Sequence, residues 1–159
     1  AEKGDAEAQY NLGWMYSNGE GVESDETVTA QWFQKAADQG HIKALYNLGV
    51  MYRDGVGVPQ DDIKSADYLL KAADQGYAPA QFNLGTLYFE GRGVPQDDIK
   101  AADYFLKAAD QGVADAQYNI GYMYYHGRGV AQDTNIAKEW LKKSANQGFK
   151  AAQESLSAM

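Results

Sequence analysis

The chain repeats itself, and this repetition constrains its fold more than any other feature of the sequence. The tetrapeptides GEGV at 19–22, GVGV at 55–58, and GRGV at 91–94 and 127–130 recur at a fixed interval of 36 residues. Other landmarks keep the same step: Gly4, Gly40, Gly76, Gly112 and Gly148; Ala8, Ala44, Ala80, Ala116 and Ala152; Tyr16, Tyr52, Tyr88 and Tyr124. A period of this length is typical of stacked repeat architectures. We therefore divide the chain into four units, 4–39, 40–75, 76–111 and 112–147, and a half unit at 148–159.

Each unit contains two helical patterns. In the first unit, Ala8, Leu12, Met15 and Tyr16 fall at spacings of three and four, which predicts a helix over about 5–17 with one apolar face. A wider apolar arc over about 25–38 predicts a second helix, and a glycine such as Gly40 follows it where a C′ glycine is expected. Strand-like alternation is poor and alanine is plentiful. We name these the A helix and the B helix of each unit, and we expect an all-α fold.

The glycine loop between the two helices, YFEGRGVPQDD at 88–98, resembles a ligand loop at first sight. A Walker-type phosphate loop needs Lys followed by Ser or Thr, where this loop has Asp97 and Asp98. A calcium loop needs oxygen ligands at alternate positions, which Arg92 and Val94 do not provide. We interpret the loop as a turn in which Asp97 caps the B helix, with Arg92 and Arg128 as exposed contacts on the loop. The capping aspartates would be Asp25, Asp61, Asp97 and Asp133.

The repeat resembles a known family. The spacing A-x-x-x-L-G-x-x-Y in ALYNLGVMY at 44–52, then G-x-G-V, a capping Asp and KAA-x-x-G, is similar to the Sel-one-like repeat, a relative of the tetratricopeptide repeat. The resemblance covers nearly the whole chain. It implies an α/α solenoid, a right-handed superhelix with a concave groove lined by the A helices. It also implies a scaffold for protein–protein interaction; bacterial members often act at the cell envelope or on host proteins, so signalling and host interaction are expected roles.

Small residues also carry predictions about packing. Gly13, Gly49, Gly85 and Gly121 lie within A helices, where glycine costs roughly 1 kcal/mol relative to alanine. We expect their missing side chains to allow close contact between helices. In the fourth B helix Lys138 and Ser144 replace the small Ala30 and Ala36 of the first, which predicts looser or reoriented packing there.

Composition excludes several classes of function. The 159-residue chain has a formal net charge of −8, which argues against a nucleic-acid binder, and it has no cysteine for disulfides or thiolate zinc sites. No apolar run approaches the 18 or so residues that span a bilayer, so no direct membrane insertion is expected. The two histidines, His41 and His126, are not equivalent in the repeat, and no hydrolase motif occurs. We expect no enzyme activity, cofactor or metal; a hydrolase with a polar site of His126 and Glu90 stays as the remote alternative.

Helix geometry places the candidate site on the side of each A helix opposite its apolar face. Tyr10, Tyr46, Phe82 and Tyr118 are aromatic in every unit, which suggests packing between neighbouring A helices. The residue types at the positions of Trp14 and Ser17 differ between units, so these positions are free to be specialised for binding. The alternative is that their side chains only cover neighbouring helices. The predicted groove residues are Tyr10, Trp14, Ser17, Lys43, Tyr46, Val50, Arg53, Phe82, Thr86, Phe89, Tyr118, Tyr122, Tyr125 and His126.

The charges of this groove are mixed, so the expected partner is a protein or an extended peptide with apolar anchors rather than a strongly charged ligand. A glycan or cell-wall ligand stacked on the same aromatics is the alternative, and a passive spacer is a third possibility. We expect a monomer. The opening AEKG aligns with ADQG at 37–40, which suggests a piece of a longer array without its targeting segment. Periplasmic, secreted and cytoplasmic locations in a bacterium all remain open.

Overall fold

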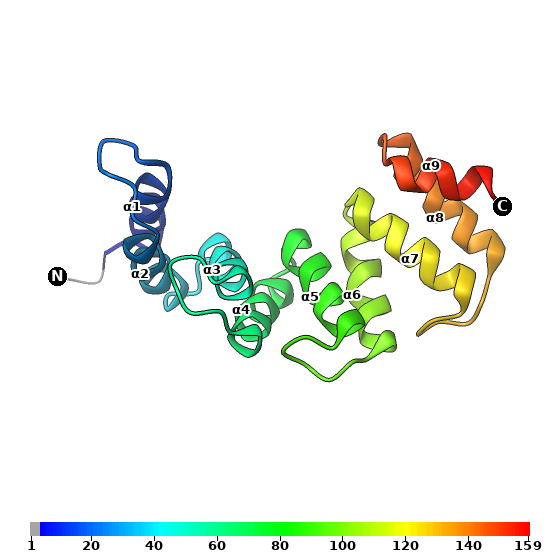
Figure 1. Ribbon diagram of the computed structural model, residues 1–159, viewed down its shortest axis with the longest axis horizontal. Coiled ribbons are helices and arrows are strands. Elements are labelled where there is room, and N and C mark those ends of the chain that lie inside the picture. Colours follow the sequence, from blue (N-terminus) through cyan, green and yellow to red (C-terminus); the bar gives the residue numbers. More distant parts are fainter. Residues whose placement is uncertain (1–3) are drawn as a thin grey trace. The chain divides into compact units, whose positions relative to one another are not determined.

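The computed structural model describes residues 4–159, and all regular elements in this range are α-helices (Figure 1). The A helices are α1 (Ala6–Asn18), α3 (Ile42–Asp54), α5 (Ala78–Glu90), α7 (Ala114–His126) and the shorter α9 (Lys150–Ser157). The B helices are α2 (Glu26–Ala37), α4 (Asp62–Asp74), α6 (Asp98–Asp110) and α8 (Thr134–Asn146). The chain divides into two compact units, an N-terminal unit ending at Tyr77 and a C-terminal unit over 78–159. The prediction of an all-α chain of helix pairs is confirmed.

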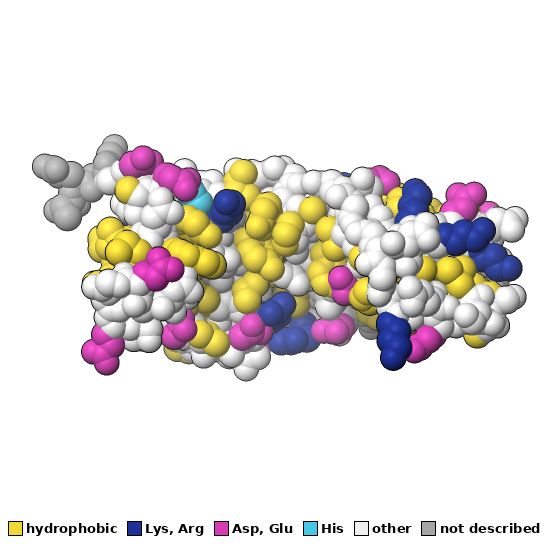
Figure 2. Space-filling view, turned by 90° about the horizontal axis from the view of Figure 1, so that it is seen from above, with side chains coloured by type: hydrophobic (Ala, Val, Ile, Leu, Met, Phe, Trp, Pro, Cys, Tyr) yellow, Lys and Arg dark blue, Asp and Glu magenta, His cyan; other side chains and the backbone are white. Residues whose placement is uncertain are grey.

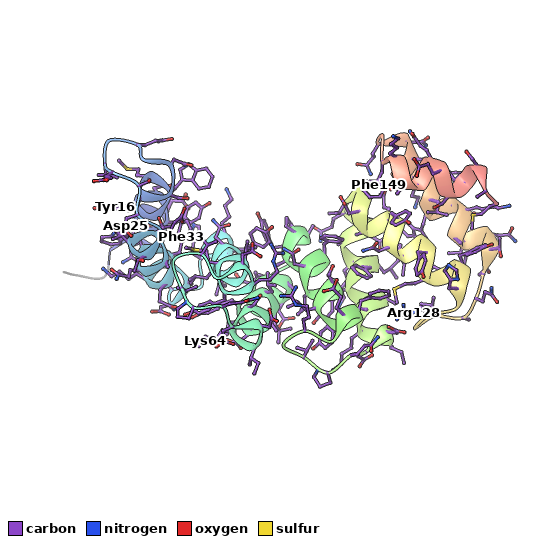
Figure 3. The ribbon with its side chains drawn as sticks, viewed as in Figure 1. Tyr16, Asp25, Phe33, Lys64, Arg128 and Phe149 are labelled. Atoms are coloured by element: carbon purple, nitrogen blue, oxygen red, sulfur yellow. The ribbon has the colours of Figure 1, made fainter. Side chains whose placement is uncertain are left out.

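The glycine loop is a turn closed at both ends. Asp97 Oδ1 accepts hydrogen bonds from the backbone N–H groups of Ile99 and Lys100, both at 3.0 Å, which caps α6 as predicted. Asp25, Asp61 and Asp133 cap their B helices in the same way; Figure 3 labels Asp25 at the start of α2. At the other end, the Gln96 side chain donates to the backbone oxygen of Phe89 at 3.1 Å. The loop therefore connects the A helix to the B helix through hydrogen bonds at both helix ends.

The two glycines of the last loop have different roles. Gly127 ends α7 in the left-handed conformation (φ 66°), and its N–H bonds to the backbone oxygen of Met123. Gly129 (φ 66°) lies against the first turn of α6, where an added Cβ would overlap the backbone oxygen of Asp98. The first glycine ends the helix, and the second lets the loop of one repeat approach the B helix of the preceding repeat.

The glycines inside the A helices are contact points between helices, as predicted. A Cβ on Gly85 would lie 2.8 Å from Cδ1 of Phe105 and 3.3 Å from the backbone oxygen of Ala101. The same position in α3, Gly49, faces Leu69, with a Cβ at 2.7 Å from its Cγ. The missing side chains let a large B-helix residue pack directly on the A-helix backbone.

The predicted apolar face of the A helices is buried in α3 and α7 but not in α1. Leu48 and Met51 of α3 are buried, because α2 packs against this helix. Their equivalents in α1, Leu12 and Met15, are 38% and 40% exposed. The interpretation of this face as core is therefore wrong for α1, since the buried state comes from a preceding B helix and not from the A helix itself.

Two of the tyrosines that mark the period, Tyr52 and Tyr88, join their A helix to its own B helix. Tyr88 stacks on Tyr104 with ring centroids 5.9 Å apart, and Lys100 Nζ lies 5.0 Å from the Tyr88 centroid. Tyr52 and Tyr68 make the same stack at 5.6 Å. Figure 3 labels Lys64, which lies over Tyr52. These rings are half-buried, so they add packing within a repeat rather than a free binding surface.

The expectation that Ser144 loosens the fourth B helix is wrong. Ser144 is fully buried, and its hydroxyl donates a hydrogen bond of 2.7 Å to the backbone oxygen of Ala114 in α7. The buried Ser144 hydroxyl therefore has a hydrogen-bond partner. Without one, its burial would cost the free energy of removing the hydroxyl from water. By contrast the buried hydroxyl of Ser65 in α4 has no hydrogen-bond partner among the described residues.

Replacing each of these two serines by alanine is expected to have different effects on the free energy of unfolding. Ser144→Ala should lower the free energy of unfolding by about 1 kcal/mol, because the Ala114 oxygen loses its donor. Ser65→Ala should leave stability unchanged or raise it by up to about 1 kcal/mol, because it removes a buried group without a partner. Urea unfolding followed by circular dichroism measures both. Equal shifts of the same sign would contradict the assignment of these hydrogen bonds.

Candidate functional site

The A helices enclose three pockets at equivalent places in the repeat. Pocket N lies between α1 and α3 in the N-terminal unit, and pockets C1 and C2 lie between α5 and α7 and between α7 and α9 in the C-terminal unit. All seven residues that line C1 have their 36-residue equivalents in C2: Thr86/Tyr122, Phe89/Tyr125, Glu90/His126, Phe105/Leu141, Asn119/Ser155, Tyr122/Ala158 and Met123/Met159. The stacking of repeats thus produces the pocket, and the residue types change from one repeat to the next.

Pocket N has a volume of about 210 Å³ and opens beside an exposed tryptophan. Trp14 is 48% exposed, and Val50 of α3 lies on the other side of the pocket. Phe33 of α2 is 3% exposed and, like Met51, is part of the buried core that the pocket reaches. Of the predicted groove residues, this pocket brings together Trp14, Ser17, Tyr46 and Val50.

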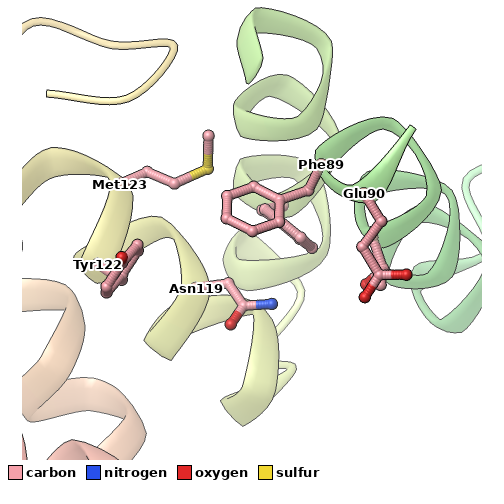
Figure 4. A pocket seen from close by; sticks show the side chains of 7 residues that line it. Phe89, Glu90, Asn119, Tyr122 and Met123 are labelled. Carbon is pink, nitrogen blue, oxygen red and sulfur yellow. The ribbon is translucent and has the colours of Figure 1, made fainter. Parts of the chain in front are cut away.

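Pocket C1, also of about 210 Å³, has aromatic walls (Figure 4). Phe89 comes from α5 and Tyr122 from α7, and the buried Phe105 and Met123 form its inner part. The carboxylate of Glu90 lies at the edge, 3.9 Å from Nη1 of Arg92. The predicted residues Thr86, Phe89 and Tyr122 meet in this pocket.

An arginine from the following loop supports pocket C1. Arg128 donates to both carboxylate oxygens of Asp98, from Nε at 3.1 Å and from Nη2 at 2.9 Å, and its Cζ lies 4.1 Å from the ring centroid of Phe89. The hydrogen bond to Asp98 is the main cause that raises the pKa of Arg128. Arg128, labelled in Figure 3, is half-buried. The expectation that it is an exposed contact is wrong, because the fold uses it to join two repeats.

Pocket C2, of about 230 Å³, is lined by Tyr118, Tyr122, Tyr125 and His126. Tyr122 and Tyr125 are 39% and 38% exposed, and His126 lies against both rings, with centroids 4.2 Å and 5.0 Å away. Leu141 of α8, which is 2% exposed, forms its inner part. All four predicted residues of this region therefore lie together, and Tyr122 lines both C1 and C2.

Four predicted groove residues lie outside the three pockets. Tyr10 stacks on Phe33 and on His41, with centroids 5.3 Å and 4.6 Å away, and burial is the main cause that raises its pKa. Phe82 packs on Phe105 at 5.9 Å. Arg53 forms an ion pair with the adjacent Asp54 at 2.8 Å, and Lys43 lines a shallow depression beside His41. Packing between neighbouring A helices was predicted for this aromatic position, and the Tyr10 ring lies against Phe33 of its own B helix and against His41, the residue just before the next A helix.

The two histidines have structural contacts. His41 Nδ1 accepts a hydrogen bond from the Ala44 N–H and caps α3, while its Nε2 lies 3.0 Å from Oε2 of Glu7. His126 packs on Tyr122 and Tyr125, and Glu90 pairs with Arg92. Within residues 4–159, no group of three or more His, Cys, Asp or Glu side chains could hold a metal ion.

Sequence reasoning missed the inner parts and edges of the pockets. Phe33, Phe105 and Leu141 of the B helices were not predicted to line the groove, although each reaches into a pocket. Asn119 was also not predicted to line a pocket, whereas Glu90, which was predicted to share a polar site with His126, lines C1 while His126 lines C2. The signal that could have found them is the period itself, because residues 33, 105 and 141 occupy one position of the repeat.

The face of the molecule drawn in Figure 2 is mixed in character. Figure 2 shows hydrophobic side chains on the face seen from above, with acidic and basic side chains nearby. No helix among residues 4–159 is long and apolar enough to cross a membrane.

Stacked helix pairs of one period, with equivalent pockets between their A helices, define a helical repeat protein of the solenoid class. The Sel1 repeat pattern matches the chain four times, at residues 6–41, 42–77, 78–113 and 114–149. The chain belongs to the Sel1 repeat family.

Solved structures agree with this assignment. A protective antigen present in uropathogenic Escherichia coli strains is 42% identical with a TM-score of 0.88, over 91% of this chain and 31% of the antigen. A Sel1 repeat protein from Oxalobacter formigenes is 35% identical with a TM-score of 0.91, over 96% of this chain and 63% of that protein. An immunity protein from Pseudomonas aeruginosa is 30% identical with a TM-score of 0.59, over 94% and 55%. The chain therefore spans less than two thirds of each of these relatives. No curated protein matches it.

Proposed function

We propose that this chain is a protein-binding scaffold that holds a peptide or protein segment in the pockets between its A helices. The observation that supports this most is the recurrence of one pocket with different walls. Trp14 stands where C1 has Thr86 and C2 has Tyr122, so the structural position is constant and the side chain is not. Exposed Trp and Tyr at such positions are the residue types that most often dominate binding energy at interfaces.

The relatives support a binding role without defining the partner. One is named a protective antigen and another an immunity protein, and neither name describes a reaction. In this chain the contacts of both histidines are structural, because His41 caps a helix and His126 packs against Tyr122 and Tyr125. We therefore favour a binding scaffold over a hydrolase.

The test uses the chain as bait with a double variant, Trp14→Ala with Tyr122→Ala. We expect the captured protein to bind the double variant at least about tenfold more weakly, because two exposed aromatic anchors are lost. Circular dichroism should show unchanged helical content.

The matched control is Ile63→Ala with Ile99→Ala. Both isoleucines are 72% exposed and outside the three pockets, so their loss tests whether any exposed apolar side chain would give the same result. Equal binding by the parent and the Trp14/Tyr122 variant would overturn the groove proposal and favour a passive spacer. A captured glycan in place of a protein would favour the alternative ligand.

A further inference from the structure

We infer that pockets C1 and C2 together form one site for an extended peptide segment with two uncharged apolar side chains, one on each side of Tyr122, and that Arg128 positions the walls of C1. This inference rests on the proposed function and adds the location of the site, the chemistry of the ligand and a positioning residue. It concerns the C-terminal unit alone.

Tyr122 is the shared wall of the site. It lines C1 together with Phe89 and lines C2 together with Tyr125, and it is 39% exposed. Its ring is held by His126, with centroids 4.2 Å apart. A peptide that fills both pockets must therefore cross this ring, and the two anchors share one contact residue.

Arg128 fixes the other wall of C1. Its guanidinium group is held by Asp98 at 2.9 Å and 3.1 Å and lies over Phe89, with its Cζ 4.1 Å from the ring centroid. One side chain thus connects Phe89 of α5 with the start of α6. A planar guanidinium held by two hydrogen bonds is a rigid support for an aromatic ring.

The equivalent pocket of the N-terminal unit lacks this support. Two periods earlier in the sequence, Val56 occupies the position of Arg128, Ser17 that of Phe89 and Val50 that of Tyr122. Val56 is 42% exposed. Pocket N therefore lacks the arginine and the aromatic residues at these two wall positions, which is the reason to place the anchored segment in the C-terminal unit.

The size and charge of the pockets indicate the ligand. An engineered apolar cavity of about 150 Å³ binds benzene, and C1 and C2 hold about 210 Å³ and 230 Å³, enough for one large side chain each. Around C1, Asp98 pairs with Arg128 and Glu90 lies near Arg92, so cations and anions balance. The side chains that line C2 include no Asp, Glu, Lys or Arg. An uncharged leucine, methionine or phenylalanine side chain fits this environment.

The test begins with single-anchor probes. N-acetyl-leucine methylamide and N-acetyl-phenylalanine methylamide are titrated into ¹⁵N-labelled protein, with the corresponding lysine and glutamate methylamides as charged controls. We expect the apolar probes to shift the backbone amides of Thr86 and Phe89 for C1 and of Leu141 and Ser155 for C2. The charged probes should bind at least about tenfold more weakly, since their charge would lose water in an apolar pocket. Equal binding of charged and apolar probes would overturn the ligand assignment.

Linked probes then test whether the two pockets act as one site. Acetylated peptides with two leucines, separated by one to six serines and closed by a methylamide, present both anchors at different spacings. At the best spacing we expect affinity at least about tenfold above the single leucine probe, because the second contact becomes intramolecular. If no spacing gains over the single probe, the two pockets are separate sites and the inference fails.

Variants separate positioning from folding. Arg128→Gln should weaken the leucine probe at C1 about two- to fivefold and leave C2 unchanged, because only C1 loses its support. Tyr122→Ala should weaken both pockets, Tyr125→Ala only C2, and Val50→Ala of pocket N neither. A general loss of structure would change C1 and C2 together, which would overturn the positioning role.

The failure of this inference is distinguishable from failure of the proposed function. If the apolar probes bind pocket N and not C1 or C2, the two-anchor site is wrong. The scaffold function still stands if the Trp14/Tyr122 variant loses its captured partner. If that variant keeps its partner, the groove proposal itself is wrong, whatever the probes do.

Discussion

Gly85→Leu is expected to lower the free energy of unfolding by about 3 kcal/mol or more, which corresponds to a fall in Tm of roughly 10 °C for a chain of this size. The first added atom, Cβ, would already lie 2.8 Å from Cδ1 of Phe105. Phe105 is 2% exposed and packs among core side chains, so it can move only by disturbing them or by entering pocket C1. Calorimetry and urea unfolding measure the loss. Because repeats are stabilised mainly by contacts with their neighbours, separating α5 from α6 should affect more than one repeat.

Glu139→Leu is the matched control for this substitution. It adds a leucine at an exposed position of a helix in the same unit, where substitutions usually change stability by less than about 0.5 kcal/mol. An unchanged Tm for Gly85→Leu would refute the close contact between α5 and α6.

Gly129→Ala is expected to be the most damaging change in the loops, with a loss of about 3 kcal/mol or more. Two causes add. A left-handed backbone costs a non-glycine residue about 1 to 2 kcal/mol, and Gly129 has φ 66°. The new Cβ would also overlap the backbone oxygen of Asp98, so the loop must move away from α6. Chemical unfolding gives the stability, and the C1 probe titration should show weaker binding because the Arg128–Asp98 contact moves with the loop.

Gly112→Ala separates the two causes. Gly112 also has positive φ (93°), but an added Cβ would meet no atom within 4 Å. Its expected loss is therefore only the conformational cost of about 1 to 2 kcal/mol. Similar losses at Gly112 and Gly129 would show that backbone conformation alone, and not the approach to α6, makes Gly129 necessary.

Much of the fold was predictable because its signals are local or periodic. The aspartate caps, the spacing of apolar residues and the glycines at 13, 49, 85 and 121 each act within one or two turns of helix, and the period repeats them. The exposed Leu12 and Met15 were not predictable in this way. An apolar stripe shows which face can be buried, whereas burial requires a second helix against it.

The candidate site was predictable in part. Ten of the predicted groove residues line a pocket, as the opposite face of each A helix suggested; they are Trp14, Ser17, Tyr46, Val50, Thr86, Phe89, Tyr118, Tyr122, Tyr125 and His126. Whether they bind a partner remains a proposal. Tyr10 and Phe82 lie in the same pattern but are held by stacking on Phe33 and Phe105. Helix position alone does not distinguish a residue that contacts a neighbour from one that faces a pocket.

The amino-acid sequence by itself determined the repeat, the helix pairs, their caps and the family of this protein, because each depends on residue types at short, regular spacings. Only the tertiary structure decided which side chains meet between repeats. Arg128 and Asp98 are 30 residues apart, and their pairing over Phe89 depends on how the loop of one repeat lies on the B helix of the preceding one. The Ser144 hydroxyl and the inner walls of the pockets depend on the same contacts. The physical reason is that the period places equivalent residues at equivalent positions, while packing between neighbouring repeats determines what each of them contacts.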